Sequence, residues 1–174
     1  DVAVADSIDS LVAAAVRECG GVDVLINNAG VACTGRIEEF DLANFDRMIA
    51  VNVSGVFYAS RAVWPIMLKR GGGVIVNISS TVAVDPIPGF AAYGATKNFV
   101  EGLTRSLAKE GKKCGIRVYA VGPGAVDTQM LRGPYPDFPA DDCLQPEEVA
   151  ETVFMMTQSA CRYSAGQTVY VTKL

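Results

Sequence analysis

Tyr93 and Lys97 are the residues whose types and spacing first suggest chemistry in this 174-residue chain. They are four positions apart, so on a helix their side chains lie on one face. A phenol has an unperturbed pKa of about 10, and a neighbouring ammonium favours the phenolate and lowers that pKa toward a useful range. Ser80 ends an apolar run upstream, where its hydroxyl could hold a carbonyl oxygen beside the phenol. The three side chains predict a proton-transfer site that interconverts an alcohol and a carbonyl.

The elements that must position these side chains alternate between short apolar runs and amphipathic segments. Strands are predicted at residues 22–26, 74–78, 116–121 and 167–172, which have the length of buried strands. Helices are predicted from about residue 7 to 19, 42 to 70 and 93 to 110, and from Pro146 onward. This alternation is typical of a parallel sheet with helices on both faces. We therefore predict one α/β domain over residues 1–174, with three α/β/α layers.

The predicted order of elements also gathers polar residues at one edge of the sheet. Asn28, Ser80 and the turn at Pro123 and Gly124 each follow a predicted strand. In open parallel sheets the ligand crevice lies beyond the carboxyl ends of the strands. The helix that carries Tyr93 begins beside this edge. A tyrosine four residues before a lysine is common in ordinary helices, so this convergence is the more specific signal.

The composition of the chain argues against several classes of function. The net charge is −4, the sequence pI is about 4.8 and the basic residues form no continuous run, which argues against a nucleic-acid partner. No stretch has the length and apolarity of a membrane span, and no secretory signal is evident. Five scattered cysteines without a C-x-x-C pair indicate free thiols in a reducing, cytoplasmic location. Histidine is absent, and no acidic cluster supports a metal site, so none is predicted.

Together these residues resemble the short-chain dehydrogenase/reductase family in its single-domain form, over essentially the whole chain. The resemblance rests on six motifs in family-like order: Asn27-Asn28-Ala29-Gly30, Asn52, Ser80, Tyr93, Lys97 and Pro123-Gly124 followed by Thr128. It implies a Rossmann-like, doubly wound parallel sheet. It also implies an NAD- or NADP-dependent oxidoreductase acting on a secondary alcohol or its ketone.

The resemblance implies a role for each of four catalytic residues. Tyr93 would exchange a proton with the substrate oxygen, and Ser80 would hold that oxygen. Lys97 would lower the pKa of Tyr93 and bond the nicotinamide ribose. Asn52 would hold a water that links Lys97 to solvent, although an asparagine within a helix is more often a packing residue. Ser79, beside Ser80, is interpreted as structural.

The resemblance also implies the residues that contact the cofactor. Besides Tyr93 and Lys97, these are Asp1, Val2, Asn28, Val126 and Thr128. Three of them have simpler interpretations: Asp1 as a disordered chain end, Asn28 as a turn residue, and Thr128 as the cap of a short helix at residues 129–131.

One departure from the family pattern concerns the phosphate-binding loop. No G-x-x-x-G-x-G motif is present, and Gly71-Gly72-Gly73 precedes a predicted strand instead of following one. We therefore expect an N-terminally truncated domain that lacks most of the first βαβαβ half, with residues 24–26 forming an unpaired apolar edge. We expect this polypeptide alone to bind dinucleotide poorly, and a micromolar dissociation constant by calorimetry would contradict that.

Two other functions remain as alternatives. A sugar-nucleotide epimerase or dehydratase shares the Tyr/Lys pair, but it carries a substantial substrate domain after the lysine, and only 77 residues follow Lys97 here. A non-catalytic dinucleotide sensor or scaffold would need none of the four catalytic residues. The substrate is a small molecule, with 3-oxoacyl thioesters, steroids and polyols all open, and loops at residues 31–39, 81–92 and 128–144 should set its choice. The family resemblance further implies a homodimer or homotetramer, for which the apolar helix at residues 51–68 is suited.

Overall fold

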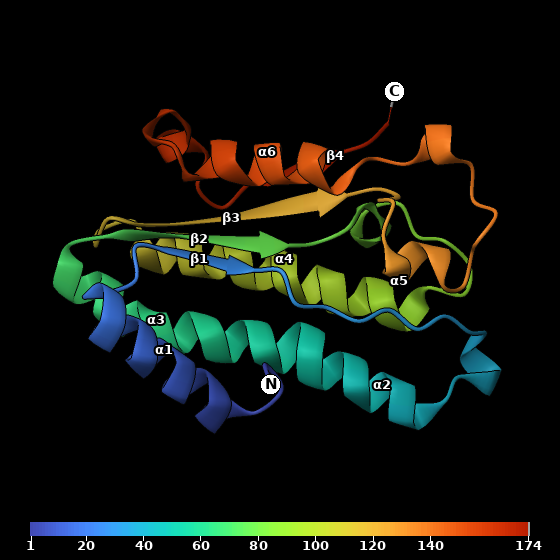
Figure 1. The fold of residues 1–174 in the computed structure, drawn as a ribbon, viewed down its shortest axis with the longest axis horizontal. Coiled ribbons are helices and arrows are strands. Elements are labelled where there is room, and N and C mark those ends of the chain that lie inside the picture. Colours follow the sequence, from blue (N-terminus) through green and yellow to red (C-terminus); the bar gives the residue numbers. More distant parts are fainter. Residues whose placement is uncertain (174) are drawn as a thin grey trace.

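A parallel sheet of four strands forms the centre of the molecule (Figure 1). The computed structural model describes residues 1–173. The strands are β1 (Val24–Asn27), β2 (Gly73–Ile78), β3 (Ile116–Pro123) and β4 (Thr168–Val171), hydrogen-bonded in that order. All three pairings are parallel, with Leu25 opposite Ile75, Ile75 opposite Val118, and Val121 opposite Val169. The predicted strands and their parallel arrangement are confirmed.

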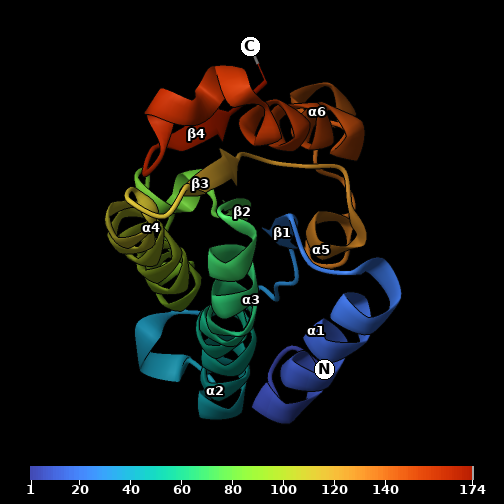
Figure 2. The same cartoon turned by 90° about the vertical axis from the view of Figure 1, so that its left-hand side faces the viewer.

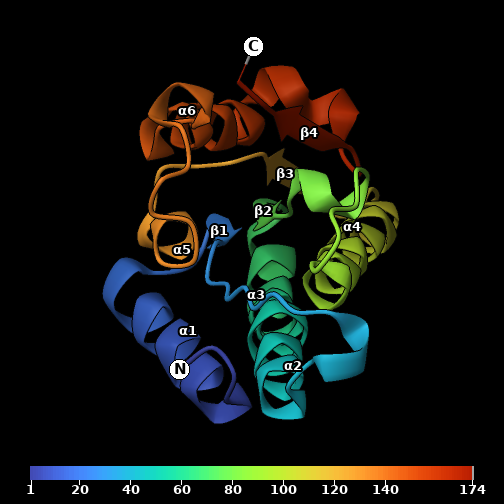
Figure 3. The same cartoon turned by 90° about the vertical axis from the view of Figure 1, so that its right-hand side faces the viewer.

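Helices cover both faces of this sheet. They are α1 (Ala5–Cys19), α2 (Leu42–Met48), α3 (Val56–Arg70), α4 (Ala91–Gly111), α5 (Gln129–Arg132) and α6 (Pro146–Thr157). Views along the strands show α3 and α4 on one side of the sheet and α6 on the other (Figures 2 and 3). The three-layer α/β/α architecture is therefore as predicted.

Two apolar clusters fix these layers because side chains alternate between the faces of a strand. The first joins β2 and β3 to α3 and α4 through Val63, Met67, Ile75, Ala108, Ile116 and Val118. The second joins the opposite face to α6 through Val74, Val76, Tyr119, Val121, Val153 and Met156. Since β2 and β3 are buried on both faces, their carboxyl ends are held rigidly.

The helical region predicted over residues 42–70 is confirmed, and its middle is wider than an α-helix. A π-helical segment, Ile49–Gly55, joins α2 to α3 without a gap. Asn52 lies in this segment and is buried, with 1% of its surface exposed. Widened turns of this kind are frequent at functional sites.

Strand β1 has a paired neighbour on one side only within residues 1–173. Its apolar side chains Val24 and Ile26 remain 43% and 48% exposed, whereas Asn27 is buried. The predicted unpaired apolar edge is therefore present in the described part of the chain. Exposed strand edges of this kind favour pairing with other chains.

Candidate active site

Ser80 and Tyr93 are brought together by two different elements. Ser80 follows β2 and opens a short turn, Thr81–Ala83, in which its hydroxyl oxygen accepts a hydrogen bond of 3.3 Å from the Val82 amide. Tyr93 lies in the first turn of α4. The Ser80 hydroxyl acts on the Tyr93 phenol by lowering its pKa. The structure thus brings together a serine at a strand end and a tyrosine at a helix start.

The protonation of Tyr93 and Lys97 is governed by burial. Burial raises the pKa of the Tyr93 phenol, and the hydrogen bond to Ser80 opposes this rise. Burial lowers the pKa of Lys97 to about 8. The rise in the pKa of Tyr93 comes from burial, so the expectation that Lys97 lowers that pKa stays a prediction. The Lys97 Nζ lies over the Tyr93 ring, 5.6 Å from its centroid.

The Lys97 ammonium is directed at the end of β2. Its Nζ donates a hydrogen bond of 2.8 Å to the carbonyl of Ile78. An ammonium has three donors, so two remain for other partners. Gly30 lies beside it, because a Cβ at that position would stand 3.7 Å from the Lys97 Nζ and 3.5 Å from the Asn52 Oδ1. The missing side chain of Gly30 keeps space open next to the ammonium.

Asn52 ties the loop after β1 to α4. Its Oδ1 accepts from the Val31 amide at 2.9 Å, and its Nδ2 donates to the Val31 carbonyl at 2.8 Å and to the Thr96 hydroxyl at 3.1 Å. Thr96 in turn donates to the Tyr93 carbonyl at 2.7 Å. Both amide hydrogens of Asn52 are engaged, so the water that Asn52 was expected to hold remains a prediction. Thr96 was missed by the sequence reasoning, and only its place beside Lys97 hinted at it.

Two of the predicted cofactor residues at the N-terminal side, Val2 and Asn28, lie near the carboxyl end of β1. Asn28 directly follows the strand and is exposed. Val2 lines a small cavity together with Asn27 and Ala29. Asp1 is exposed and ordered in a turn, where its Oδ1 accepts a hydrogen bond of 2.9 Å from the Ala3 amide.

Val126 and Thr128 lie on the loop after β3. Val126 forms an isolated parallel bridge with Leu144. Thr128 precedes α5 and is exposed, and its hydroxyl donates to the Val126 carbonyl at 3.3 Å instead of capping the helix. Thr128 is thus the N-cap residue of α5, as the simpler interpretation had it, but its side chain makes no capping hydrogen bond. The two residues follow a strand at the same edge of the sheet as Asn28 and Ser80.

The loop predicted over residues 128–144 is held in a defined shape by Arg132. This side chain pairs with Asp127 at 2.7 Å and donates to the carbonyls of Pro136 and Phe138. The loop brings Tyr135 onto Phe90, with ring centroids 6.5 Å apart and an interplanar angle of 19°. Phe90 meets Tyr93 edge-on at 6.3 Å. An aromatic row therefore leads from the loop to the predicted catalytic phenol.

Two further polar residues beside the site were not singled out as functional. Ser79 donates a hydrogen bond of 2.8 Å to Glu101, which lies one helical turn beyond Lys97 and is 5% exposed. Glu101 follows Lys97 at the same four-residue spacing that separates Lys97 from Tyr93, so the sequence places it on the same helix face. Because charged residues are seldom buried, a glutamate on that face could have been singled out from the sequence. Within residues 1–173, no three Cys, Asp or Glu side chains cluster as a metal site, and no helix is long and apolar enough to cross a bilayer.

Comparison with known proteins identifies the family. Residues 1–137 match the sequence model of the family described as short chain dehydrogenase. The chain belongs to the short-chain dehydrogenase family. The motifs quoted above from Asn27 to Thr128 all lie within the matched residues.

Similar proteins include both reductases and dehydrogenases. A 3-oxoacyl-[acyl-carrier-protein] reductase of Synechocystis sp. is 38% identical over 177 aligned residues, which cover 98% of this chain and 72% of the relative. A gluconate 5-dehydrogenase of Burkholderia cenocepacia, solved with NADP and tartrate, superposes with a TM-score of 0.93 at 27% identity, covering 99% of this chain and 72% of that one. A 3-ketoacyl-(acyl-carrier-protein) reductase of Brucella melitensis, solved with NADH, has a TM-score of 0.89 at 32% identity, covering 98% and 74% of the two chains.

Proposed function

We propose that this protein is an NAD(P)-dependent oxidoreductase that interconverts a secondary alcohol and a ketone, with Tyr93 as the acid and base. One observation carries the proposal: the Tyr93 phenol lies beside buried Ser80, and the buried ammonium of Lys97 lies one helical turn away, 5.6 Å from the centroid of the Tyr93 ring. A scaffold or sensor needs none of these groups. Family membership supports the same class of reaction.

In the direction of reduction, Tyr93 donates its proton to the carbonyl oxygen of the substrate. Its raised pKa keeps the phenol protonated at neutral pH, which suits it to that step. Ser80 holds the same oxygen and keeps the substrate in place. Lys97, with a pKa of about 8, is charged at pH 7 and offsets the negative charge that develops on the phenolate. In oxidation the same residues act in reverse.

The residues present fit a nicotinamide cofactor. Lys97 keeps two donors for ribose hydroxyls, and the absent side chain at Gly30 leaves room beside them. When bound, the nicotinamide supplies or accepts the hydride. We further propose that Asp1, Val2, Asn28, Val126 and Thr128 contact the cofactor. The solved relatives with NADP and with NADH support either dinucleotide.

For the substrate we propose a small, moderately apolar carbonyl compound such as a 3-oxoacyl thioester. The aromatic row of Tyr135, Phe90 and Tyr93 gives the site an apolar wall. Two relatives named as 3-oxoacyl or 3-ketoacyl reductases support this class. The five free thiols support a reducing, cytoplasmic location.

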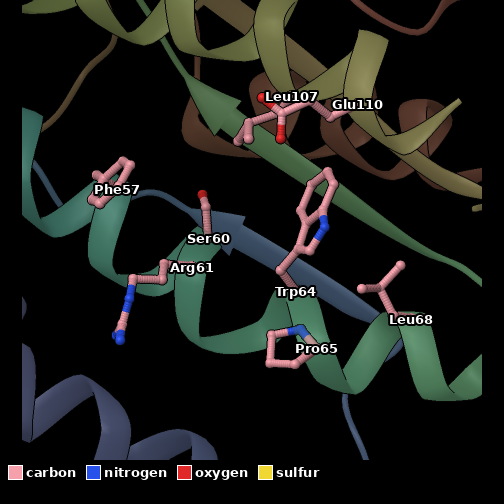
Figure 4. A pocket seen from close by; sticks show the side chains of 8 residues that line it. All are labelled: Phe57, Ser60, Arg61, Trp64, Pro65, Leu68, Leu107 and Glu110. Carbon is pink, nitrogen blue, oxygen red and sulfur yellow. The ribbon is translucent and has the colours of Figure 1, made fainter.

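We also propose that the chain forms a homodimer or homotetramer through α3 and α4. A groove of about 250 Å³ lies between these helices, away from the site (Figure 4). It is lined by Phe57, Ser60, Arg61, Trp64, Pro65, Leu68, Leu107 and Glu110. An apolar groove with an arginine and a glutamate on opposite helices is suited to an isologous contact between two copies. Sedimentation velocity with Trp64→Glu tests this, because the charge should give a smaller assembly.

The experiment that tests the proposed activity is the Tyr93→Phe variant. In the full-length protein, reduction of acetoacetyl-CoA with NADPH should fall by about 10²- to 10⁴-fold, because the variant lacks the transferable proton. Tyr163→Phe is the matched control, since Tyr163 is 87% exposed and should leave turnover unchanged. Equal turnover in Tyr93→Phe and wild type would end the assignment of Tyr93 as acid and base.

A further inference from the structure

Three consecutive residues, Ile78 to Ser80, run from the end of β2 along one face of α4. The Ile78 carbonyl accepts from Lys97 at 2.8 Å, and the Ser79 hydroxyl donates to Glu101 at 2.8 Å. Ser80 lies beside Tyr93 and lowers the pKa of its phenol. The three helix residues are Tyr93, Lys97 and Glu101, spaced four apart, and such positions share one helix face. We call these three contacts the β2–α4 seam.

Glu101 is the member of the seam that the proposed reaction does not use. Its Oε1 accepts two hydrogen bonds, from the Ser79 hydroxyl at 2.8 Å and from the Tyr170 hydroxyl at 2.7 Å. Its Oε2 lies 3.8 Å from the Arg105 guanidinium. Glu101 is 5% exposed, and burying a charged group is costly unless it is paired and hydrogen-bonded. The contacts of Glu101 satisfy that condition and join β2, α4 and β4 at one carboxyl group.

The hydroxyl of Tyr170 is a dependable donor in this arrangement. Burial and the hydrogen bond to Glu101 raise its pKa to about 12, so it keeps its proton at neutral pH. Its ring packs over Gly122, where a Cβ would stand 2.6 Å from the Tyr170 Cδ1. The backbone of β3 is therefore shaped to admit this side chain. Tyr170 therefore contacts the Glu101 carboxylate from β4, whereas Arg105 contacts it from α4.

We propose that Glu101 is a positioning residue that sets Ser80 against Tyr93 by holding Ser79. Ser79 and Ser80 are neighbours in the chain, so fixing the side chain and amide of Ser79 restricts where the Ser80 hydroxyl points. The Ser79 amide is itself held by the Val121 carbonyl at 2.7 Å. With one side chain bonded to α4 and the backbone bonded to β3, the segment has little freedom to move. This inference rests on the proposed function of Ser80 and Tyr93, but its structural part can be measured without activity.

The test compares four variants of the full chain. Glu101→Leu and Ser79→Ala each break the central contact of the seam. Glu101→Gln keeps an oxygen that can accept from both hydroxyls, so it should restore what Glu101→Leu loses. Thr104→Val is the structural control. Thr104 is fully buried on the same helix and is hydrogen-bonded to Asn77 at 2.8 Å, but it lies outside the seam.

The first readout is amide hydrogen exchange of residues 79–83 in the protein without ligands. Exchange should accelerate by about tenfold in Glu101→Leu and in Ser79→Ala, because local opening becomes easier. Glu101→Gln and Thr104→Val should stay within about twofold of wild type. Unchanged exchange in Glu101→Leu, or equal acceleration in Thr104→Val, would overturn the proposal.

The second readout is the pH dependence of kcat/KM, measured with NADP⁺ and 3-hydroxybutyryl-CoA. The Ser80 hydrogen bond lowers the pKa of Tyr93, so a displaced Ser80 should move the rising limb to higher pH. Glu101→Leu should show that shift with a kcat about 100-fold lower and KM for NADP⁺ within about twofold. Thr104→Val should lower the melting temperature without moving the limb. If the rising limb of Glu101→Leu stays at the wild-type pH, the positioning role is refuted. Absence of turnover in wild type would count against the proposed function, and the exchange result alone would then decide whether Glu101 positions residues 79–83.

Discussion

Lys97 donates to the Ile78 carbonyl at 2.8 Å, whereas its Nζ lies 5.6 Å from the centroid of the Tyr93 ring. The ammonium is thus held by the end of the strand that also carries Ser80. Because it is buried, its proton is held less tightly than in water. At this position the charge of Lys97 lies beside the proposed site. Burying that charge has a cost, because it lowers the free energy of unfolding.

The first prediction follows from that cost. The pKa of Lys97 is lowered from 10.5 to about 8, so between these values the unfolded chain binds more protons than the folded one, and stability rises with pH. Roughly 2 kcal/mol of this rise should fall between pH 7.5 and 9.5. Urea unfolding at the two pH values should show the rise in wild type and not in Lys97→Met. Lys109→Met, which removes an exposed lysine of the same helix, should keep it; a rise that survives in Lys97→Met would show that another group is responsible.

The second prediction concerns Ser80. Its hydrogen bond lowers the pKa of Tyr93, so Ser80→Ala should raise that pKa further. The rising limb of kcat/KM for alcohol oxidation should therefore move to higher pH, with a loss of about 100-fold at pH 7. Steady-state rates over pH 6–10 measure both effects. Ser106→Ala, an exposed serine on α4, should match wild type, and a shift toward lower pH in Ser80→Ala would contradict the assigned role.

The third prediction tests Asn52 as the tie between the loop after β1 and α4. Asn52→Ala leaves the amide and carbonyl of Val31 without their side-chain partner. The free energy of unfolding should fall by about 2–4 kcal/mol, as expected when buried polar groups lose their hydrogen bonds. Asn44→Ala on α2 removes the same amide at a half-buried position and should cost less than about 1 kcal/mol. Equal losses in urea unfolding would show that Asn52 has no special structural role.

The fourth prediction uses two glycines of α4. A Cβ at Gly111 would lie 2.3 Å from the Ile116 carbonyl oxygen, whereas a Cβ at Gly102 would meet only the Arg105 guanidinium at 3.9 Å. Gly111→Ala should therefore destabilise the fold by more than about 2 kcal/mol, because β3 must shift. Gly102→Ala should stabilise it by about 0.5–1 kcal/mol through helix propensity. Thermal unfolding separates the two, and a stabilised Gly111→Ala would contradict the packing of α4 on β3.

The sequence predicted the strands, the layers and the pairing of Ser80 with Tyr93 because these depend on local pattern. Apolar runs bounded by turn residues mark β2 and β3, and helical spacing places Tyr93 and Lys97 on one face. The π-helical turn at Ile49–Gly55 could not be read from the sequence, since such a turn leaves the apolar periodicity nearly unchanged.

The burial of the ionisable groups at the site could not be read from the sequence. Helical spacing suggested that Lys97 would lower the pKa of Tyr93, but spacing does not show where the ammonium points or how deeply the phenol is buried. The Lys97 ammonium donates a hydrogen bond to the Ile78 carbonyl. Burial determines the direction in which the pKa values of Tyr93 and Lys97 are shifted. Glu101 was overlooked for a similar reason, because its partners Ser79 and Tyr170 are 22 and 69 residues away in sequence.

The contact between Tyr170 and Glu101 has a consequence for protein synthesis. Ser79, Ser80, Tyr93 and Glu101 all leave the ribosome well before Tyr170 does, and chains fold progressively from the N-terminal side. A nascent chain therefore exposes Ser79, Ser80, Tyr93 and Glu101 before Tyr170 has been synthesised. The contact between Glu101 and Tyr170 can form only after β4 has been added to the sheet.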